Sequence, residues 1–254
     1  MRDGLIVFLL SGLLAVTASA SARADEIRVA VAANFLSTAR QLEAAFEAEH
    51  DHQVTLIPGS TGLLYAQIVQ GAPFDILLAA DQARPSALAA RGLGLEDTRF
   101  TYATGQLSLL FQPGDAVPAD LRGILQQASR IAMAQPELAP YGLAAGQVLD
   151  ALGLSEKTAD NQVYGVNVAQ VYAVVATGNA DAGFIARSAL VQSPVPDGLK
   201  TIDIPASLHR PVHQDAIRLA RGRSPAAAQA FLDYLRSPSA RALMQQAGYE
   251  SHAP

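Results

Sequence analysis

Cysteine is absent from this sequence of 254 residues, and lysine occurs only at positions 157 and 200. The absence of cysteine excludes disulfides, thiolate metal ligands and a cysteine nucleophile. A formal net charge of −5 with so few lysines does not provide the basic surface typical of nucleic-acid-binding proteins, so we expect no nucleic-acid partner. Half of the residues are hydrophobic, and the chain is long enough to build one large domain or two small ones around a core.

The first 24 residues have the pattern of a secretory signal peptide. Residues 5–16 are almost wholly apolar, and residues 18–24 are mostly small and end in Ala-Arg-Ala. An apolar core of about a dozen residues is shorter than the roughly 20 that a membrane-spanning helix needs. We therefore predict cleavage after Ala24, with an uncleaved anchor as the alternative. Cleavage removes two arginines and one aspartate and changes the formal charge from −5 to −6, so bulk charge does not attract anions.

Strand and helix patterns alternate along the mature chain. A first unit has expected strands at 26–33, 53–57 and 74–79 and helices at 35–50, 63–70 and 85–91. A second unit follows residues 105–111, with strands at 130–134, 162–164 and 182–186 and helices at 141–152 and 168–177. Two helices, 225–236 and 239–247, end the chain. This alternation predicts two α/β units, each with a parallel sheet covered by helices.

Two stretches without helical pattern, near residues 100–108 and 209–216, are expected to cross between the two units. The C-terminal helices have no strand of their own, so we expect them to pack on the first unit. Two crossings make a hinge. Ligands of such folds bind at the carboxyl ends of the strands, in the crevice where the lobes meet.

Four strand-to-helix turns would face this crevice, at residues 32–34, 59–62, 139–142 and 166–168. Helix N-termini with Ser, Thr or Asn beside them are natural anion sites, because unpaired N–H groups and the positive end of the helix dipole coincide there. The alternative for each turn is an ordinary helix cap, worth about 1 kcal/mol. None of the four turns contains a carboxylate.

Other side-chain groups give weaker indications. No complete nucleophile elbow, phosphate loop or dinucleotide fingerprint is present, which favours binding over catalysis. His50, Asp51 and His52 could hold a metal, but a solvated polar cluster is the commoner outcome, and we expect no metal-cation site. Asp75 and Asp81 could suggest acid–base chemistry; a strand-start residue and a helix cap are the simpler interpretations.

Six short runs occur in a fixed order along the chain: VAANFL at 31–36, GSTGLLYAQI at 59–68, GAPFD at 71–75, AAD at 79–81, APYGLA at 139–144 and GY at 248–249. Together they resemble the periplasmic molybdate-binding proteins of ATP-driven (ABC) importers, over essentially the whole mature chain. The resemblance implies a type II periplasmic-binding-protein fold, which consists of two discontinuous α/β lobes joined by a two-strand hinge. The implied order is a signal peptide at 1–24, the first part of lobe I at 25–103, lobe II at 104–209 and the rest of lobe I at 210–254.

The resemblance also implies a function and a set of site residues. In that family, hydroxyls, an amide and backbone N–H groups from four turns hold the oxyanion without a counter-charge. When the binding positions of that family are matched to this sequence, the implied ligand-binding residues are Ala33, Asn34, Ser60, Thr61, Tyr141 and Val168. Asn34 would donate through its side chain or its N–H, and Ser60 and Thr61 lie at the hydroxyl position. Some members of that family have a tyrosine hydroxyl donor near the position of Ala186, whose side chain has no such group.

The implied role is capture of molybdate or tungstate, as ligand rather than cofactor, for an ABC permease in the inner membrane. We therefore expect a monomeric periplasmic protein that is not an enzyme. Both anions need only donors at pH 7, whereas phosphate keeps a proton whose burial without an acceptor costs about 1–3 kcal/mol. Sulfate differs only in size. A binder of sulfate or another small anion, or an exported α/β hydrolase or transferase, remains an alternative.

Overall fold

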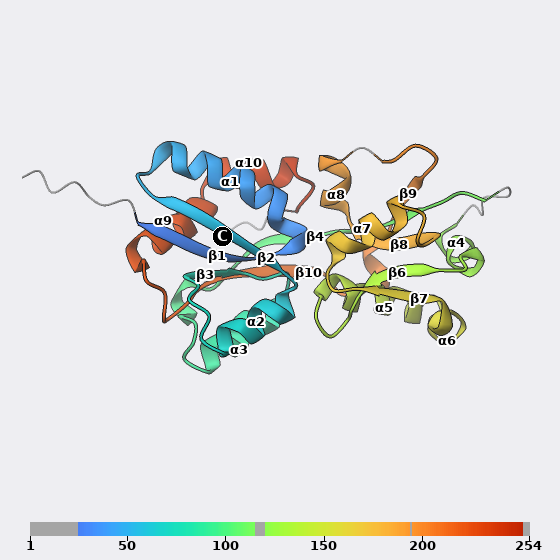
Figure 1. The fold of residues 1–254 in the computed structure, drawn as a ribbon, viewed down its shortest axis with the longest axis horizontal. Helices are drawn as coiled ribbons and strands as arrows, with labels where there is room; N and C mark the ends of the chain where they lie inside the picture. Colours follow the sequence, from blue (N-terminus) through green and yellow to red (C-terminus); the bar gives the residue numbers. More distant parts are fainter. Residues whose placement is uncertain (1–24, 115–119, 194, 251–254) are drawn as a thin grey trace, which may run out of the picture.

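The computed structural model describes residues 25–114, 120–193 and 195–250, which form two lobes lying side by side (Figure 1). The predicted signal peptide and its cleavage site lie outside the described residues. Each lobe is built on one five-stranded sheet with helices on both sides. In the described part of the chain, no helix is both long enough and apolar enough to span a membrane.

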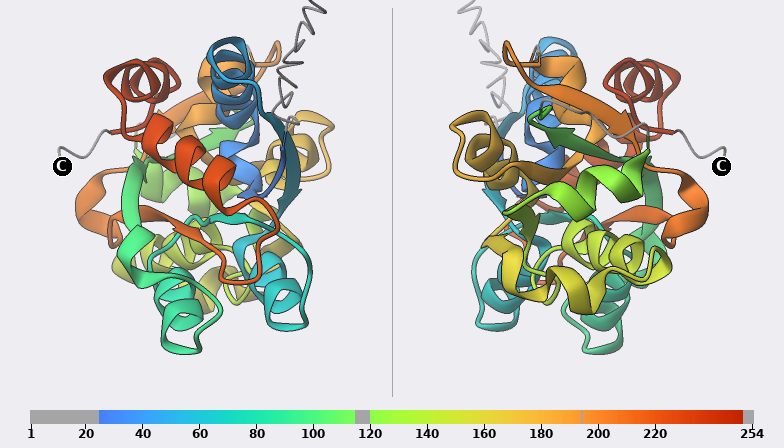
Figure 2. Two further views of the ribbon diagram at one scale, coloured as in Figure 1. Left: turned by 90° about the vertical axis from the view of Figure 1, so that its left-hand side faces the viewer. Right: turned by 90° about the vertical axis from the view of Figure 1, so that its right-hand side faces the viewer.

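The first sheet has the strand order β2-β1-β3-β10-β4. Its strands are β1 (Glu26–Ala32), β2 (Gln53–Gly59), β3 (Ile76–Leu78), β4 (Phe100–Gly105) and β10 (Val212–Arg218). Alternate residues of β1 enter different cores: Val29 and Val31 pack with α1 (Leu36–Glu49), α9 (Pro225–Leu235) and α10 (Pro238–Gln246), and Ala30 packs with α2 (Thr61–Val69) and α3 (Ala83–Ala90). The end-on views show the C-terminal helices beside the N-terminal elements (Figure 2). The C-terminal helices thus complete the first lobe, as the sequence predicts.

The second sheet has the order β7-β6-β8-β5-β9. Its strands are β5 (Leu107–Phe111), β6 (Ile131–Ala134), β7 (Gln162–Gly165), β8 (Ala182–Ala186) and β9 (Lys200–Asp203). The helices of this lobe are α4 (Leu121–Gln127), α5 (Pro140–Ala151), α6 (Ser155–Thr158), α7 (Val168–Ala176) and α8 (Arg187–Gln192). Four 3-10 turns complete the described chain: η1 (Ala33–Phe35), η2 (Glu96–Thr98), η3 (Ala159–Asn161) and η4 (Ala206–Leu208).

The two-lobed α/β class is confirmed, but the expectation of wholly parallel sheets is wrong. In the first sheet β1 runs parallel to β2 and β3, whereas β10 runs antiparallel to β3 and β4. In the second sheet β5 runs antiparallel to β8 and β9. The physical reason is the hinge, because a strand that continues from one lobe into the other enters the second sheet against the direction of its parallel strands.

Asp75 ties three segments of the first lobe together. Its carboxylate is 1 % exposed. Oδ2 accepts the N–H of Arg28 at 2.7 Å, and Oδ1 accepts the N–H groups of Arg223 at 2.6 Å and Ser224 at 3.1 Å. The side chain therefore joins β1 and the entry to β3 to the loop before α9, which is a structural role and not acid–base chemistry. Asp81 accepts the N–H of Arg84 at 3.0 Å and caps the start of α3, as predicted.

Candidate functional site

A cavity of about 10 Å³ lies between the lobes, where the four predicted turns meet. All six residues predicted for the site line this cavity. The full lining is Ala32, Ala33, Asn34, Gly59, Ser60, Thr61, Ala80, Ala139, Pro140, Tyr141, Asn167 and Val168. A volume of this size is about that of one water-sized sphere, so the lobes are close together in this structure. Among the described residues, this lining contains neither a carboxylate nor a cationic side chain.

Ser60 is the most informative residue of the cavity. It is 4 % exposed, and among the described residues its Oγ has no hydrogen-bond partner. Leaving a buried hydroxyl unpaired costs about 1–3 kcal/mol, so such groups are rare unless a ligand or water satisfies them. Ser60 precedes the first residue of α2 but does not cap that helix through its side chain. Its hydroxyl is therefore a spare buried donor beside the cavity.

The neighbouring hydroxyl of Thr61 is also prepared to donate. Thr61 is 1 % exposed, and its Oγ1 accepts the backbone N–H of Ala80 at 3.0 Å. A hydroxyl has one proton and two acceptor positions. Because the oxygen already accepts a hydrogen bond, the proton of Thr61 remains available to an acceptor in the cavity. Ala80, which the sequence did not mark as a site residue, fixes this orientation.

The polar side chains of Asn34 and Tyr141 are engaged behind the cavity. Asn34 Nδ2 donates to Gln214 Oε1 at 3.0 Å and to Tyr249 Oη at 3.3 Å. The Tyr141 hydroxyl accepts from Gln214 Nε2 at 3.4 Å. Of the two donor groups suggested for Asn34, its side-chain amide is thus committed to protein partners, and the backbone is what it can offer a ligand.

Backbone donors from four helix starts complete the lining. Ala33 begins η1, Thr61 begins α2, Tyr141 is the second residue of α5, and Val168 begins α7. N–H groups in the first turn of a helix have no partner within that helix. They also lie at the positive end of the helix dipole. The described lining of the cavity is consequently uncharged and includes several backbone N–H donors.

Two hydrogen bonds close the lobes over one side of the cavity. The N–H of Gly62 donates to the carbonyl of Leu138 at 2.9 Å, and Arg84 Nη2 donates to the carbonyl of Glu137 at 2.6 Å. Arg84 is held in place by an ion pair with Asp81. A Cβ at position 62 would lie 3.0 Å from Leu138 Cα and carbonyl oxygen, so glycine permits the close approach. Arg84 therefore makes a contact between the lobes.

Comparison with known proteins adds independent evidence. The family described as bacterial extracellular solute-binding protein matches residues 27–250 of this chain. The chain belongs to this family. Curated relatives include the molybdate-binding protein ModA of Azotobacter vinelandii, 40 % identical over 247 residues and covering 96 % of each chain. The ModA of Rhodobacter capsulatus is 38 % identical over 90 % of this chain and 89 % of that protein.

A solved structure agrees with this solute-binding family in fold. The periplasmic molybdate-binding protein of Azotobacter vinelandii superposes with a TM-score of 0.82 at 34 % identity, over 89 % of this chain and 100 % of that one. The resemblance seen in the sequence runs is thereby confirmed, and the named relatives are binding proteins.

Three buried tyrosines form the polar network behind the cavity of this solute-binding protein. The Tyr102 hydroxyl lies 3.1 Å from two acceptors, the carbonyl oxygen of Ala79 and Gln214 Oε1, which share its single proton, and the Tyr249 hydroxyl donates to the carbonyl of Asn34 at 2.7 Å. Burial raises the pKa of Tyr249 to about 12 and holds the pKa values of Tyr102 and Tyr141 well above their usual range. All three phenols stay neutral at physiological pH, so the network places no negative charge behind the cavity.

These tyrosines make the protein sensitive to alkali. Above pH 10 the unfolded chain releases phenol protons that the folded chain retains, so the free energy of unfolding falls as pH rises. The expected slope is up to about 1.4 kcal/mol per pH unit for each buried tyrosine. Urea unfolding between pH 8 and 11 measures it. Tyr249→Phe should flatten the slope and the half-exposed Tyr164→Phe should not; equal slopes in both variants would contradict the assignment.

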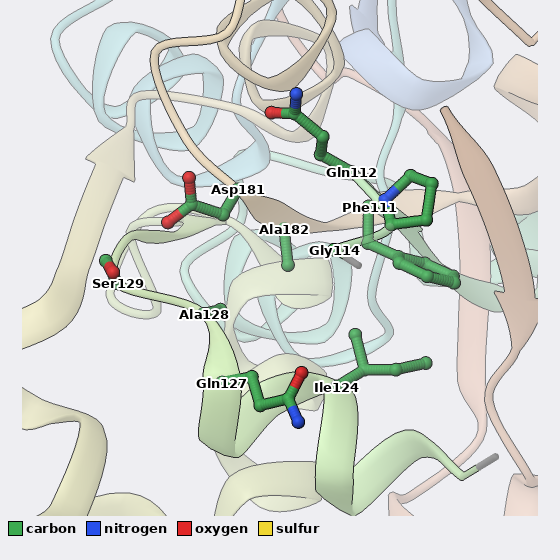
Figure 3. A pocket seen from close by; sticks show the side chains of 10 residues that line it. Phe111, Gln112, Gly114, Ile124, Gln127, Ala128, Ser129, Asp181 and Ala182 are labelled. Carbon is green, nitrogen blue, oxygen red and sulfur yellow. The ribbon is translucent and has the colours of Figure 1, made fainter. Parts of the chain in front are cut away.

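A larger cavity of about 330 Å³ lies in the second lobe, away from the four turns (Figure 3). It adjoins the end of β5 and the start of β8, through Phe111 and Ala182. Its polar side chains Gln112, Gln127 and Asp181 point in different directions around it. Asp181 also accepts the N–H of Arg130 at 2.8 Å. Because no set of donors converges there, the interlobe cavity remains the better candidate site.

The histidine pair near residue 50 packs against the first lobe. The His50 ring stacks on Phe46 with centroids 4.2 Å apart, and its Nδ1 lies 3.0 Å from the Phe46 carbonyl oxygen. The His52 ring also stacks on the Phe46 ring, with centroids 6.4 Å apart. Within residues 25–114, 120–193 and 195–250, no group of three or more His, Cys, Asp or Glu side chains could hold a metal ion.

Proposed function

We propose that this protein captures molybdate or tungstate in the interlobe cavity, with Ala33, Asn34, Ser60, Thr61, Tyr141 and Val168 as the binding residues, and delivers it to an ABC transporter. The observation that carries the proposal is the buried, unpartnered hydroxyl of Ser60 next to the hydroxyl of Thr61, whose proton is free. Charge-assisted hydrogen bonds from such donors are about twice as strong as neutral ones. The names of the relatives, which are molybdate-binding proteins, support the same ligand.

The uncharged lining, with no carboxylate among its described residues, accounts for the proposed selectivity. A fully ionised oxyanion accepts from every donor and leaves none of its own protons unpaired. Phosphate at pH 7 still carries a proton, and no carboxylate in the described part of the chain lines the cavity to accept it. Burying that proton unpaired costs about 1–3 kcal/mol, which is roughly a 5- to 150-fold loss of affinity. Sulfate is excluded only if its smaller size leaves the donors too far away.

The proposed mechanism is capture by lobe closure, without catalysis. Lobe I comprises residues 25–103 and 210–254, and lobe II comprises residues 104–209. The anion contacts turns of both lobes, so it favours the closed state over the open one. The Gly62–Leu138 and Arg84–Glu137 contacts belong to that closed state. Export with loss of residues 1–24, a monomeric state and recognition of the closed form by an inner-membrane permease complete the proposal.

Calorimetric titration of residues 25–254 tests the ligand. Molybdate and tungstate are expected to bind tightly with one-to-one stoichiometry, and sulfate and phosphate weakly or not at all. Tight sulfate binding would indicate that sulfate, and not molybdate or tungstate, is the ligand. Absence of heat with all four anions would refute an oxyanion site.

Thr61→Val should weaken molybdate binding at least tenfold, because it removes a hydroxyl donor while keeping the shape of the side chain. Loss of a hydrogen bond to a charged group costs about 1.5–3 kcal/mol. Thr61→Ser, which keeps the hydroxyl, and His52→Ala, which lies outside the cavity, are the controls and should bind nearly as the parent does. Calorimetric titration of the parent and the three variants with molybdate gives the affinities to compare. Full affinity in Thr61→Val would show that the Thr61 hydroxyl does not bind the anion.

A further inference from the structure

Gln214 lies at the hinge and connects the two lobes behind the cavity. It belongs to β10, is fully buried and does not line the cavity. Its Oε1 accepts from Asn34 Nδ2 at 3.0 Å and from the Tyr102 hydroxyl at 3.1 Å. Its Nε2 donates to the Tyr141 hydroxyl at 3.4 Å. One amide thus joins the first turn of lobe I to the helix start of α5 in lobe II.

The backbone around Gln214 holds this amide in position. The pairing of β10 with β4 shifts register between Gln214 and Asp215. Asp215 is fully buried and bonds Arg99 Nη1 at 2.8 Å, Thr101 Oγ1 at 2.7 Å and Gln82 Nε2 at 3.2 Å. Successive residues of a strand point to opposite faces. Anchoring Asp215 in the first lobe therefore fixes the direction of Gln214 toward the cavity-forming turns.

The other crossing strand leaves the space that this arrangement needs. Gly105 is the last residue of β4. A Cβ on Gly105 would overlap the Tyr141 hydroxyl and would lie 2.7 Å from Gln214 Nε2. The phenol and the amide thus fill the position of a missing side chain between the two hinge strands. Any shift of the hinge changes the distance between the partners of Gln214.

We propose that Gln214 is a positioning residue for oxyanion binding, which holds the turns of Asn34 and Tyr141 at the separation that the bound anion requires. This inference rests on the proposed function and adds a residue that does not touch the ligand. The role requires a side chain that accepts on one side and donates on the other. An amide does both, whereas a carboxylate only accepts and methionine of similar length does neither to a useful degree.

The test compares molybdate affinities of the mature chain and its variants, with thermal unfolding measured in parallel. Gln214→Met and Tyr141→Phe are each expected to raise the Kd at least tenfold. The double variant should have a Kd no higher than that of the weaker-binding single variant, because both substitutions remove the same hydrogen bond. Such coupling between neighbours is what a double-mutant cycle detects. Gln106→Met is the matched control: this second hinge glutamine bonds Glu250 and Arg187 away from the cavity, and its loss should leave the Kd within twofold.

Gln214→Glu separates positioning from a general loss of stability. The ionised carboxylate cannot donate to Tyr141 and repels the anion, whereas the protonated acid can donate again. Burial raises the pKa of such an acid. The Kd of this variant should therefore fall as pH is lowered from 8 to 6, while the parent Kd stays constant. A parental Kd in Gln214→Met, multiplicative effects in the double variant, or a pH-independent Kd in Gln214→Glu would overturn the inference. Failure of the parent to bind molybdate would instead refute the proposed function.

Discussion

Replacing Ser60 with aspartate is expected to raise the Kd for molybdate at least about a thousandfold. The substitution places a carboxylate in a buried position beside a cavity whose described lining has no cationic side chain. Two like charges about 4 Å apart repel by about 4 kcal/mol at the effective dielectric constant found near protein sites, and a dianion doubles the charge on one side. Since about 1.4 kcal/mol is a factor of ten, the repulsion alone reaches the expected loss. Calorimetric titration at pH 8 measures it.

Ser60→Asn is the matched control for this charge. Asparagine has the same shape as aspartate and shares any steric cost, so the difference between the two variants reports the charge alone. The neutral variant should retain measurable binding. Equal affinities in Ser60→Asp and Ser60→Asn would show that the bound species lies too far from Ser60 to be held by it.

The largest effect on stability is expected from Asp75→Ala, which should reduce the free energy of unfolding by about 3–5 kcal/mol. Three backbone N–H groups, those of Arg28, Arg223 and Ser224, lose a charged acceptor. Each hydrogen bond to a charged group contributes about 1.5–3 kcal/mol, and the N–H groups left behind are unsatisfied. For a protein of this size the loss corresponds to a melting temperature lower by about 10 °C.

Thermal unfolding of Asp75→Ala measures this loss, and Asp51→Ala is the control. Asp51 is exposed, so its substitution should leave the melting temperature nearly unchanged. Molybdate affinity at 25 °C should remain close to parental in both variants, since Asp75 does not line the cavity. A melting temperature of Asp75→Ala within about 2 °C of the parent would show that water replaces the carboxylate at little cost.

Sequence patterns predicted most strands of the two sheets, including the edge strands β2 and β7, but missed β9. The strand predicted at 26–33 is β1 at Glu26–Ala32, because five of its seven residues are buried and apolar. The edge strand β9 was missed, since its four residues, Lys200–Asp203, are mostly exposed and carry no apolar pattern. The antiparallel direction of β10 has no local signal. It depends on how the chain returns across the hinge, which is a tertiary property.

The candidate site was also predicted in part: its residues could be named from the sequence, but the directions of their side chains could not. Helix-start residues after buried strands can be recognised locally, and the structure brings all six predicted residues to one cavity. The direction of each side chain could not be predicted, because it depends on partners that are distant in sequence. Asn34 is turned toward Gln214 and Tyr249, and Thr61 is oriented by the N–H of Ala80. Gln214 itself stands in a polar run, His213 to Asp215, and its burial has no local signal in the sequence.

The discontinuous first lobe has a consequence for the order of folding. The strands of the second sheet come from one continuous stretch, β5 to β9, whereas β3 must wait for β10, with Leu78 pairing with Ala216. Pairings of such long sequence separation form slowly, and chains are made from the N-terminus onward. The first lobe therefore stays incomplete until the last quarter of the polypeptide arrives. In a chain exported as proposed, with its N-terminus first, the lobes can close around the cavity only after β10 has crossed the membrane.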